Sequence, residues 1–198
     1  NGIITDFTGP AGIWVFDGDS VDIDRQNYIN IFQANWKQFI ENGSGFLTYE
    51  YALYNNDANE YVTGWTATGD TWVDIRGLDL TENVTYSLHL IGIDNVYNES
   101  EIFMSDGALV DLSAPAVPAN FVGWFSHERI YLEWSPNQEI DVDYYSIYGG
   151  TDPNPTTLLL TTQDTTAEAF MTDFSDTSLY YICMTATDIP GNQSDHTQ

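Results

Sequence analysis

The stretch YSLHLIGIDNVYNES (86–100) decides the fold, because it recurs later in the chain as YYICMTATDIPGNQS (180–194). A tyrosine, an aspartate, an asparagine and a serine stand at the same spacing in both copies. Each copy begins with an apolar run of strand length and ends in a polar segment typical of a turn. We therefore expect a hairpin whose Asp, Asn and Ser side chains bond to the backbone of the turn.

The repeat extends upstream of this stretch. INIFQANW (29–36) parallels RIYLEW (129–134), and each tryptophan is followed by a polar loop and a tyrosine-rich strand, YEYALY (49–54) or YYSIY (144–148). The chain of 198 residues thus contains one structural unit twice. The two copies meet near SAPAVP (113–118), a proline-containing stretch that suits a short, stiff linker.

Short runs rich in Val, Ile, Thr and aromatic residues alternate along the chain with clusters of Gly, Pro, Asn and Asp. No segment keeps a sustained 3.6-residue apolar period, so the sequence predicts an all-β protein. We expect two tandem antiparallel β-sandwiches. Trp36 and Trp134 should fill their centres, and Tyr86 and Tyr180 should bond to backbone at their corners.

Further motifs carry a family resemblance. The second copy shows WSPNQEIDVDYYSIY (134–148) and ends in ATD-x-x-GN-x-S (186–194). The first copy shows FDG (16–18), DID-x-Q (22–26), ANW-x-x-F (34–39), SGF-x-x-YEYAL (44–53), V-x-x-WT (62–66) and SDG-x-x-VD-x-SAP (105–115). The second copy resembles a fibronectin type III domain of bacterial extracellular proteins, and the first resembles a related repeat of large secreted, multi-repeat surface proteins.

This resemblance implies a fibronectin type III-like fold and an extracellular or cell-surface location. It says little about function, because such sandwiches serve adhesion, spacing and carbohydrate binding alike. Tyr97 and Asn98 depart from the pattern, since they stand where the family usually has Gly-Asn. We expect that turn to differ.

The N-terminal residues are out of phase with the repeat. NGIITDFTGP (1–10) matches DGALVDLSAP (106–115), the end of the first copy, while the second copy stops at Gln198, the counterpart of Met104. We therefore predict three segments: residues 1–12 as the last strand of another sandwich, 13–114 as the first sandwich, and 115–198 as a second sandwich lacking its last strand. The residues that mark the extra strand for assembly are Gly2, Ile3, Ile4, Asp6 and Pro10.

Two kinds of serial linkage fit this offset. In one, the sequence is a single period of a longer chain of such units. In the other, separate subunits join head to tail, and each donates its N-terminal strand to a neighbour. A boundary that falls by accident within a longer protein is the remaining explanation. Under either linkage, the expected partners are further copies of the same unit.

The charge excludes several classes of partner. The chain has 30 acidic and four basic residues, a net charge of −26. Proteins that bind nucleic acids or anionic lipids neutralise phosphates with Lys and Arg, so neither partner fits. No apolar run is long enough to insert into a membrane. The single cysteine, Cys183, lies in an apolar strand and is expected to be a small buried side chain.

The densest acidic cluster predicts a calcium site. Asp17, Asp19, Asp22 and Asp24 alternate within a glycine-containing loop, where their oxygens could converge on a hard cation. Asp6 and Asp111 occupy equivalent junctions and form a second candidate pair. Glu139, Asp141 and Asp143 form a weaker third candidate, and a solvated acidic loop remains the alternative in each case. Calcium is the one cofactor these patterns suggest.

The other chemical signals are weaker. Sequons for N-glycosylation occur at Asn42, Asn83, Asn98 and Asn192. No catalytic motif is found, and the sequence predicts no enzyme. Three functions are therefore compared: a structural repeat of an extracellular filament, stalk or fibre; an adhesin or carbohydrate-binding spacer using Trp65, Trp72 or Trp124; and an accessory region of a secreted enzyme. The first is the preferred hypothesis.

Overall fold

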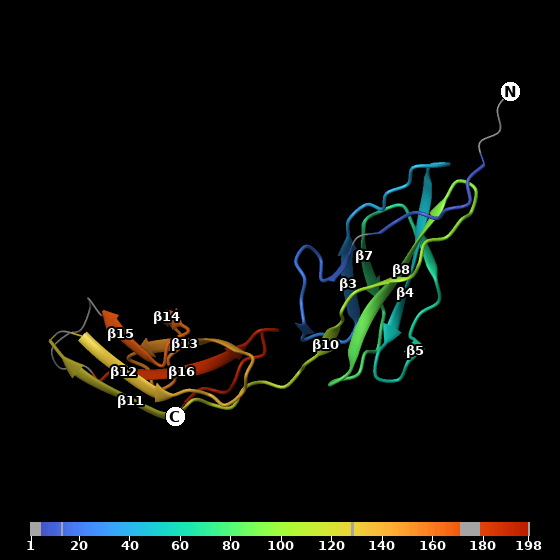
Figure 1. Ribbon diagram of the computed structural model, residues 1–198. Helices are drawn as coiled ribbons and strands as arrows, with labels where there is room; N and C mark the ends of the chain where they lie inside the picture. The colour runs from blue at the N-terminus through green and yellow to red at the C-terminus, as the bar shows by residue number, and fades with distance from the viewer. Residues whose placement is uncertain (1–4, 13, 128, 171–178, 198) are drawn as a thin grey trace. The chain divides into compact units, whose positions relative to one another are not determined.

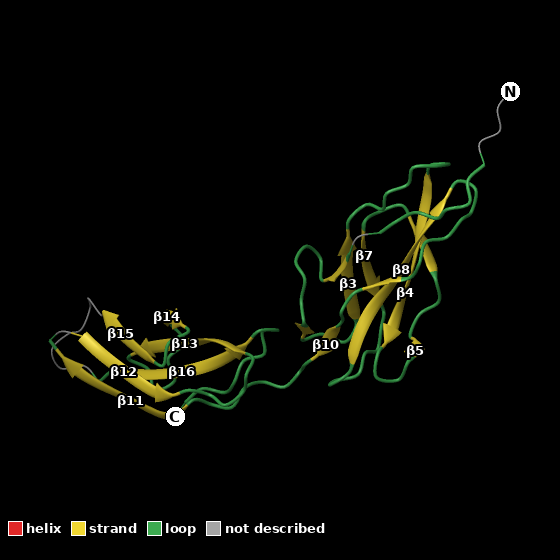
Figure 2. Cartoon of the chain, in the orientation of Figure 1, coloured by secondary structure: helices red, strands yellow, loops and turns green. Residues whose placement is uncertain are grey.

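The computed structural model describes residues 5–12, 14–127, 129–170 and 179–197. The chain divides into two compact units, Asn1–Leu112 and Ser113–Gln198. The described residues form strands and loops without a helix (Figure 1; Figure 2). The prediction of an all-β chain is confirmed.

The first unit consists of two sheets. The smaller sheet has the order β1-β3-β7, formed by Val15–Asp17, Ile31–Trp36 and Trp72–Arg76. The larger sheet has the order β2-β10-β8-β4-β5, and β6 and β9 pair with β4 and β8. Its strands are β2 (Arg25–Gln26), β4 (Phe46–Asn55), β5 (Glu60–Tyr61), β6 (Thr66–Thr68), β8 (Thr85–Asp94), β9 (Phe103–Met104) and β10 (Ala108–Val110). All pairs are antiparallel except β2 with β10, which is parallel.

The second unit repeats this arrangement, with fewer strands among its described residues. One sheet has the order β11-β12-β15, formed by Ala119–Ser126, Arg129–Ser135 and Thr166–Phe170. The other has the order β14-β13-β16, formed by Leu158–Thr162, Val142–Gly150 and Tyr181–Asp188. The strands β12, β13 and β16 occupy the positions of β3, β4 and β8 in the first unit.

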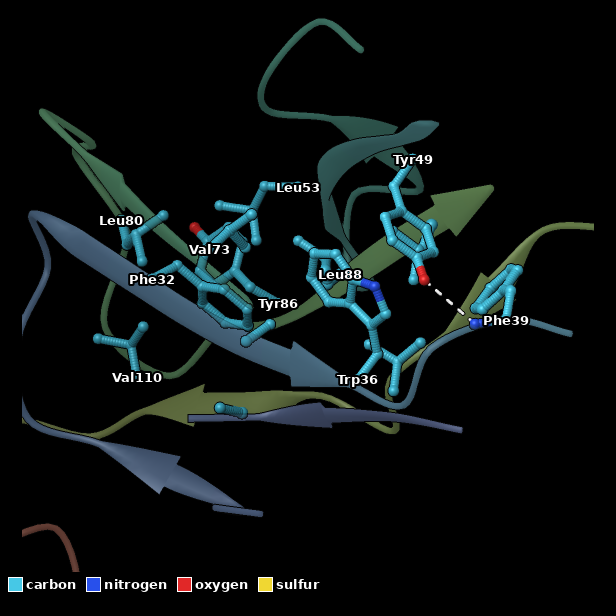
Figure 3. Close-up of a cluster of buried hydrophobic side chains, with 14 residues drawn as sticks. Phe32, Trp36, Phe39, Tyr49, Leu53, Val73, Leu80, Tyr86, Leu88 and Val110 are labelled. Carbon is cyan, nitrogen blue, oxygen red and sulfur yellow. Dashed lines mark hydrogen bonds between the residues drawn. The ribbon is translucent and has the colours of Figure 1, made fainter. Parts of the chain in front are cut away.

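The core of each sandwich contains the tryptophan expected from the sequence. Strand β3 alternates strictly between half-buried and buried residues, and Trp36 ends it in the buried phase. The side chain of Trp36 packs edge-on against Tyr49, whose hydroxyl accepts the backbone N–H of Phe39 at 3.1 Å (Figure 3). Phe32 and Leu88 lie in the same cluster.

The second core repeats these contacts. Trp134 is buried and packs edge-on against Tyr145, with ring centroids 5.3 Å apart, the same separation as between Trp36 and Tyr49. The hydroxyl of Tyr145 accepts the backbone N–H of Asn137 at 3.1 Å. Each core thus contains a Trp–Tyr pair, and the tyrosine hydroxyl bonds to the loop that follows the tryptophan.

The repeated stretches form hairpins held by their own side chains. In the first unit Asp94 Oδ1 accepts the N–H of Asn98 at 2.8 Å, and Asp188 Oδ1 accepts that of Asn192 at 2.6 Å in the second. The exceptional turn residue Tyr97 has φ 68°, where its counterpart Gly191 has φ 98°. Tyr97 therefore carries the left-handed conformation that glycine adopts without steric cost.

The corner tyrosine of the first unit bonds to backbone, and the described residues near the N-terminus form no strand. The buried Tyr86 accepts the N–H of Thr81 with its hydroxyl at 3.0 Å, and Tyr180 is half-buried. Gly2, Ile3 and Ile4 lie outside the described residues. Residues 5–10 form no strand within this chain, and Ala11 makes an isolated antiparallel bridge with Ile40. The predicted pairing of residues 1–10 with another copy stays a prediction.

Candidate functional site

The outer edge of β16 distinguishes the two units. In the first unit β8 continues outward to β9 and β10, where Leu90 pairs with Phe103 and Tyr86 with Ala108. In the second unit the backbone N–H of Thr197 bonds to Met184 O at 2.9 Å, as the start of an equivalent pairing. Within the described residues, no strand follows in the position of β10, so β16 ends its sheet.

The position of β10 in the first unit is a core position. In the first unit β10 contributes Ala108 and Val110, both fully buried, and its backbone bonds to Val84 and Asn83 at 3.0 and 2.8 Å. In the second unit, residues 194–197 bond to Ala186 and Met184 on the outer edge of β16, and no described strand pairs at Leu179 and Tyr180, the counterparts of Thr85 and Tyr86. An open edge presents unpaired backbone groups to which another extended segment can add.

The N-terminal segment and the linker each contact the loop that follows the core tryptophan of the next sandwich, the first through backbone groups and the second through side chains. Ala11 pairs with Ile40, in the loop that follows Trp36. Ala116 donates its N–H to Glu139 Oε1 at 2.7 Å, in the loop that follows Trp134. Both alanines follow a proline at the matched position of the repeat. Residues 5–11 thus repeat the part of the linker that leads into a sandwich.

Asp6 anchors this segment. Its Oδ2 accepts the N–H of Ser44 at 2.7 Å, and its Oδ1 accepts the N–H of Thr8 at 3.1 Å. These backbone hydrogen bonds, from Thr8 first and then Ser44, lower the pKa of Asp6 from 3.8 to about 2. The neighbouring Phe7 is 87% exposed.

Three carboxylates converge at one end of the first sandwich. One oxygen each of Asp17, Asp22 and Asp106 lies within 4.8 Å of the others. Asp17 ends β1 and is fully buried, whereas Asp22 and Asp106 are exposed in loops. The pKa of Asp17 is raised from 3.8 to about 7, chiefly by burial and also by the charges of Asp106 and Asp22, against hydrogen bonds from Ser105 and Gly107 that lower it.

The remaining predicted calcium ligands lie elsewhere. Asp19 bonds to the hydroxyl of its neighbour Ser20, and the backbone oxygen of Asp24 accepts the N–H of Leu109. Asp111 forms a salt bridge of 2.9 Å with Arg25. Among the described residues, Asp6 is grouped with Glu41 and Asp94 instead of Asp111.

The sequence did not single out Asp106, Glu41 or Asp94 as ligands. Asp106 joins Asp17 across 89 positions of sequence, because β10 returns beside the start of the sandwich; Gly107 N–H bonds to Asp17 Oδ2 at 2.8 Å. The signal available was the Asp-Gly pair before the last strand. Asp94 is held by its own hairpin, with hydrogen bonds to Asn98 and Val96. Burial raises the pKa of Asp94, but these hydrogen bonds lower it by more, so the pKa is lowered overall.

The sequon asparagines fall into two groups. Asn42 and Asn83 are exposed in loops. The side-chain amides of Asn98 and Asn192, which would carry a glycan, donate to Asp94 at 2.7 Å and Asp188 at 2.9 Å. Both hairpins thus use these amide groups structurally.

Exposed aromatic rings occur on both units. Trp72 and Trp124 are 55% and 49% exposed, and Trp124 lies nearly parallel to Tyr131 with ring centroids 5.7 Å apart. Trp65 contacts Tyr61, whose hydroxyl lies 3.1 Å from His89 Nδ1. Burial lowers the pKa of His89, which favours the neutral ring at neutral pH.

Comparisons with known proteins give the fold. No family model and no curated protein matches the sequence. Among solved structures, the chain is similar to the chicken CNTN1 FN1–FN3 domains, with a TM-score of 0.54, 12% identity, and coverage of 96% of this chain and 66% of that one. A segment of two fibronectin type III domains from chicken tenascin matches with a TM-score of 0.38 and 14% identity, covering 96% of this chain and 97% of that one.

In the described part of the chain, no helix is long and apolar enough to span a membrane. The likeness to the CNTN1 domains covers nearly all of the chain, and it agrees with the paired sheets seen in each unit. The chain therefore has the fold of two tandem fibronectin type III-like sandwiches.

Proposed function

We propose that the chain is a structural repeat unit of an extracellular filament, stalk or surface fibre, in which units are joined in series through the outer edge of β16. The observation that carries the proposal is the difference between β8, which β10 covers, and β16, which ends its sheet among the described residues. A strand from another unit would pair at Leu179 and Tyr180, where the chain enters β16, as β10 pairs with Thr85 and Tyr86 at the start of β8.

The N-terminal segment is the strand that fits this edge. In the match of residues 1–10 to 106–115, Ile3 takes the place of the buried Ala108. In the repeat, Gln198 corresponds to Met104 and Asn1 to Asp106. If Asn1 of another unit followed Gln198, only the position of Ser105 would be left unfilled between them. A continuous chain of units and a head-to-tail polymer of separate subunits would both supply the strand.

The charge supports an extracellular setting. A net charge of −26 on one unit repels neighbouring units, and salt and divalent cations outside the cell screen that repulsion. The four Lys and Arg residues leave little capacity to bind nucleic acid. A length-giving role needs no catalytic group, and we assign none.

Assembly of the purified chain tests the proposal. Negative-stain electron microscopy and sedimentation should show linear polymers, and deletion of residues 1–10 should leave monomers with the first sandwich still folded. Ile3→Asp should also abolish assembly, because it places a charge at a core position. The matched control Phe7→Asp adds the same charge at a position that is exposed in this chain, and it should still assemble.

The intact mass of the protein from its source separates the two forms of linkage. A mass near 22.3 kDa indicates separate subunits, and a multiple of it indicates a continuous repeat. Polymers that form equally well without residues 1–10, together with a native protein that contains no further copy, would refute serial linkage through β16.

A second candidate, an adhesin or carbohydrate-binding spacer, is favoured by the exposed tryptophans. The ring of Trp124, backed by Tyr131, offers a flat aromatic face of the kind that stacks on sugars. Binding on a glycan array that is lost in Trp124→Ala would support this function. Absence of binding in the unchanged chain would remove it.

A further inference from the structure

The buried carboxylate of Asp17 has one oxygen without a hydrogen bond of ordinary geometry, although the Ser105 hydroxyl lies close to the carboxylate. Its Oδ2 accepts the N–H of Gly107 at 2.8 Å, but its Oδ1 is buried and has no hydrogen-bond partner. The side chain as a whole is fully buried. A buried carboxylate oxygen without a partner costs free energy, so native structures generally pair such groups or use them to coordinate metals.

The surrounding groups supply further oxygens. The carboxylates of Asp22 and Asp106 each bring an oxygen within 4.8 Å of a carboxylate oxygen of Asp17 and of one another. Two oxygens on opposite sides of one calcium ion, each about 2.4 Å from it, are separated by about that distance. Asp22 is held in place because its Oδ1 accepts the N–H of Asp17 at 3.0 Å.

The donor set selects the class of ion. Three carboxylates and no nitrogen or sulfur ligand suit a hard divalent cation. Asp22 and Asp106 are exposed, so water can complete the coordination shell. Calcium accepts six to eight oxygens in flexible geometry, whereas magnesium requires a nearly ideal octahedron. An irregular set of one buried and two loop carboxylates fits calcium better.

We propose that Asp17, Asp22 and Asp106 bind one calcium ion, which fastens the turn before β10 to the end of β1. The ion would hold the start of the last strand of the first sandwich. The second sandwich has no equivalent carboxylate: Gly123 lies opposite Leu132 as Asp17 lies opposite Ala34. This site therefore accounts for one ion per chain.

Calorimetric titration of the whole chain with CaCl₂ tests the site, after removal of metal with EDTA and in ~0.15 M NaCl to screen nonspecific binding. One ion should bind, and saturating calcium should raise the unfolding midpoint of the first sandwich by about 5 °C or more. Asp17→Asn and Asp106→Asn should each weaken binding at least tenfold. Asp106 is exposed, so its variant remains informative if the Asp17 variant folds poorly.

The matched control is Asp70→Asn, which removes the same charge from an exposed turn away from the cluster. It should bind calcium as the unchanged chain does. Absence of heat and of a midpoint shift at 10 mM CaCl₂, about ten times the Kd of the weakest extracellular calcium sites, would overturn the proposal. Unchanged binding in both Asp17→Asn and Asp106→Asn, or equal stabilisation by magnesium, would overturn it as well.

Discussion

Adding the missing strand to the C-terminus should stabilise the second sandwich. The change is an extension of Gln198 by one serine followed by a copy of residues 1–12. The serine occupies the position of Ser105, because Gln198 matches Met104 and Asn1 matches Asp106. The added isoleucines then fall where Ala108 and Leu109 stand in the first unit.

The size of the effect follows from β10. Burying one isoleucine fully and one partly contributes about 4 kcal/mol. Roughly four backbone hydrogen bonds, of the kind that β10 makes with the chain around β8, contribute about 1 kcal/mol each. Ordering about four residues costs roughly 6 kcal/mol. The expected gain is about 2 kcal/mol, or roughly a 30-fold shift of the opening equilibrium.

Hydrogen exchange followed by mass spectrometry is the assay. Amides of β16 (Tyr181–Asp188) should exchange roughly 30-fold more slowly in the extended chain, if exchange requires opening of the sheet. Amides of β8 (Thr85–Asp94) serve as an internal control and should not change.

A second extension, with Ile3→Asp in the added copy, separates pairing from a nonspecific effect of extra residues. It should give no added protection, because the aspartate would be buried. If β16 exchanges at the same rate in all three chains, or equally slowly in both extended chains, the proposed strand addition is wrong.

Four other predictions follow from the fold. Tyr49→Phe and Tyr145→Phe should each lower the free energy of unfolding of their own sandwich by about 1–2 kcal/mol, measured by denaturant titration, because a loop N–H loses its acceptor. The pKa of Asp6 is lowered, so its contribution to stability is complete above pH 3.8 and is lost as the pH falls through about 2. The unfolding midpoint between pH 4 and pH 2 should therefore fall less steeply in Asp6→Asn. Tyr97→Gly should stabilise the first sandwich by up to about 1 kcal/mol in the same titration, because it relieves a positive φ. Gly191→Ala should destabilise the second sandwich by about 1 kcal/mol or more, because alanine is strained at a positive φ. A lower stability in Tyr97→Gly, or a higher one in Gly191→Ala, would contradict the argument.

The sequence predicted the strands that face the core on one side. IFQANW alternates in hydrophobicity and is buried at every second residue, so β3 could be read directly. Strand β11 was not predicted, because most of its residues are exposed and its apolar side chains follow no such alternation. Hydrophobic pattern therefore located the strands that line the core and missed an edge strand that faces solvent.

The carboxylate cluster shows the limit for sites. Asp17 and Asp22 are near in sequence, and their spacing grouped them with Asp19 and Asp24; among the described residues, the structure places oxygens of Asp17 and Asp22 close together, without Asp19 or Asp24. Asp106 joins them through the return of β10, a contact between distant parts of the chain that no local spacing encodes. Asp111 pairs with Arg25 for the same reason. A single sequence gives local groups, and the sheet order completes them.

The antiparallel pairing of β10 with β8 also has a mechanical meaning. If a strand from a neighbouring unit took the same place beside β16, tension along the fibre would act along that strand. All of its hydrogen bonds would then be loaded together in shear, instead of opening one after another from an end. Such a joint would resist pulling strongly while it remained easy to separate by peeling, and a fibre built in this way would have two ends that differ: one with a free strand and one with a free edge.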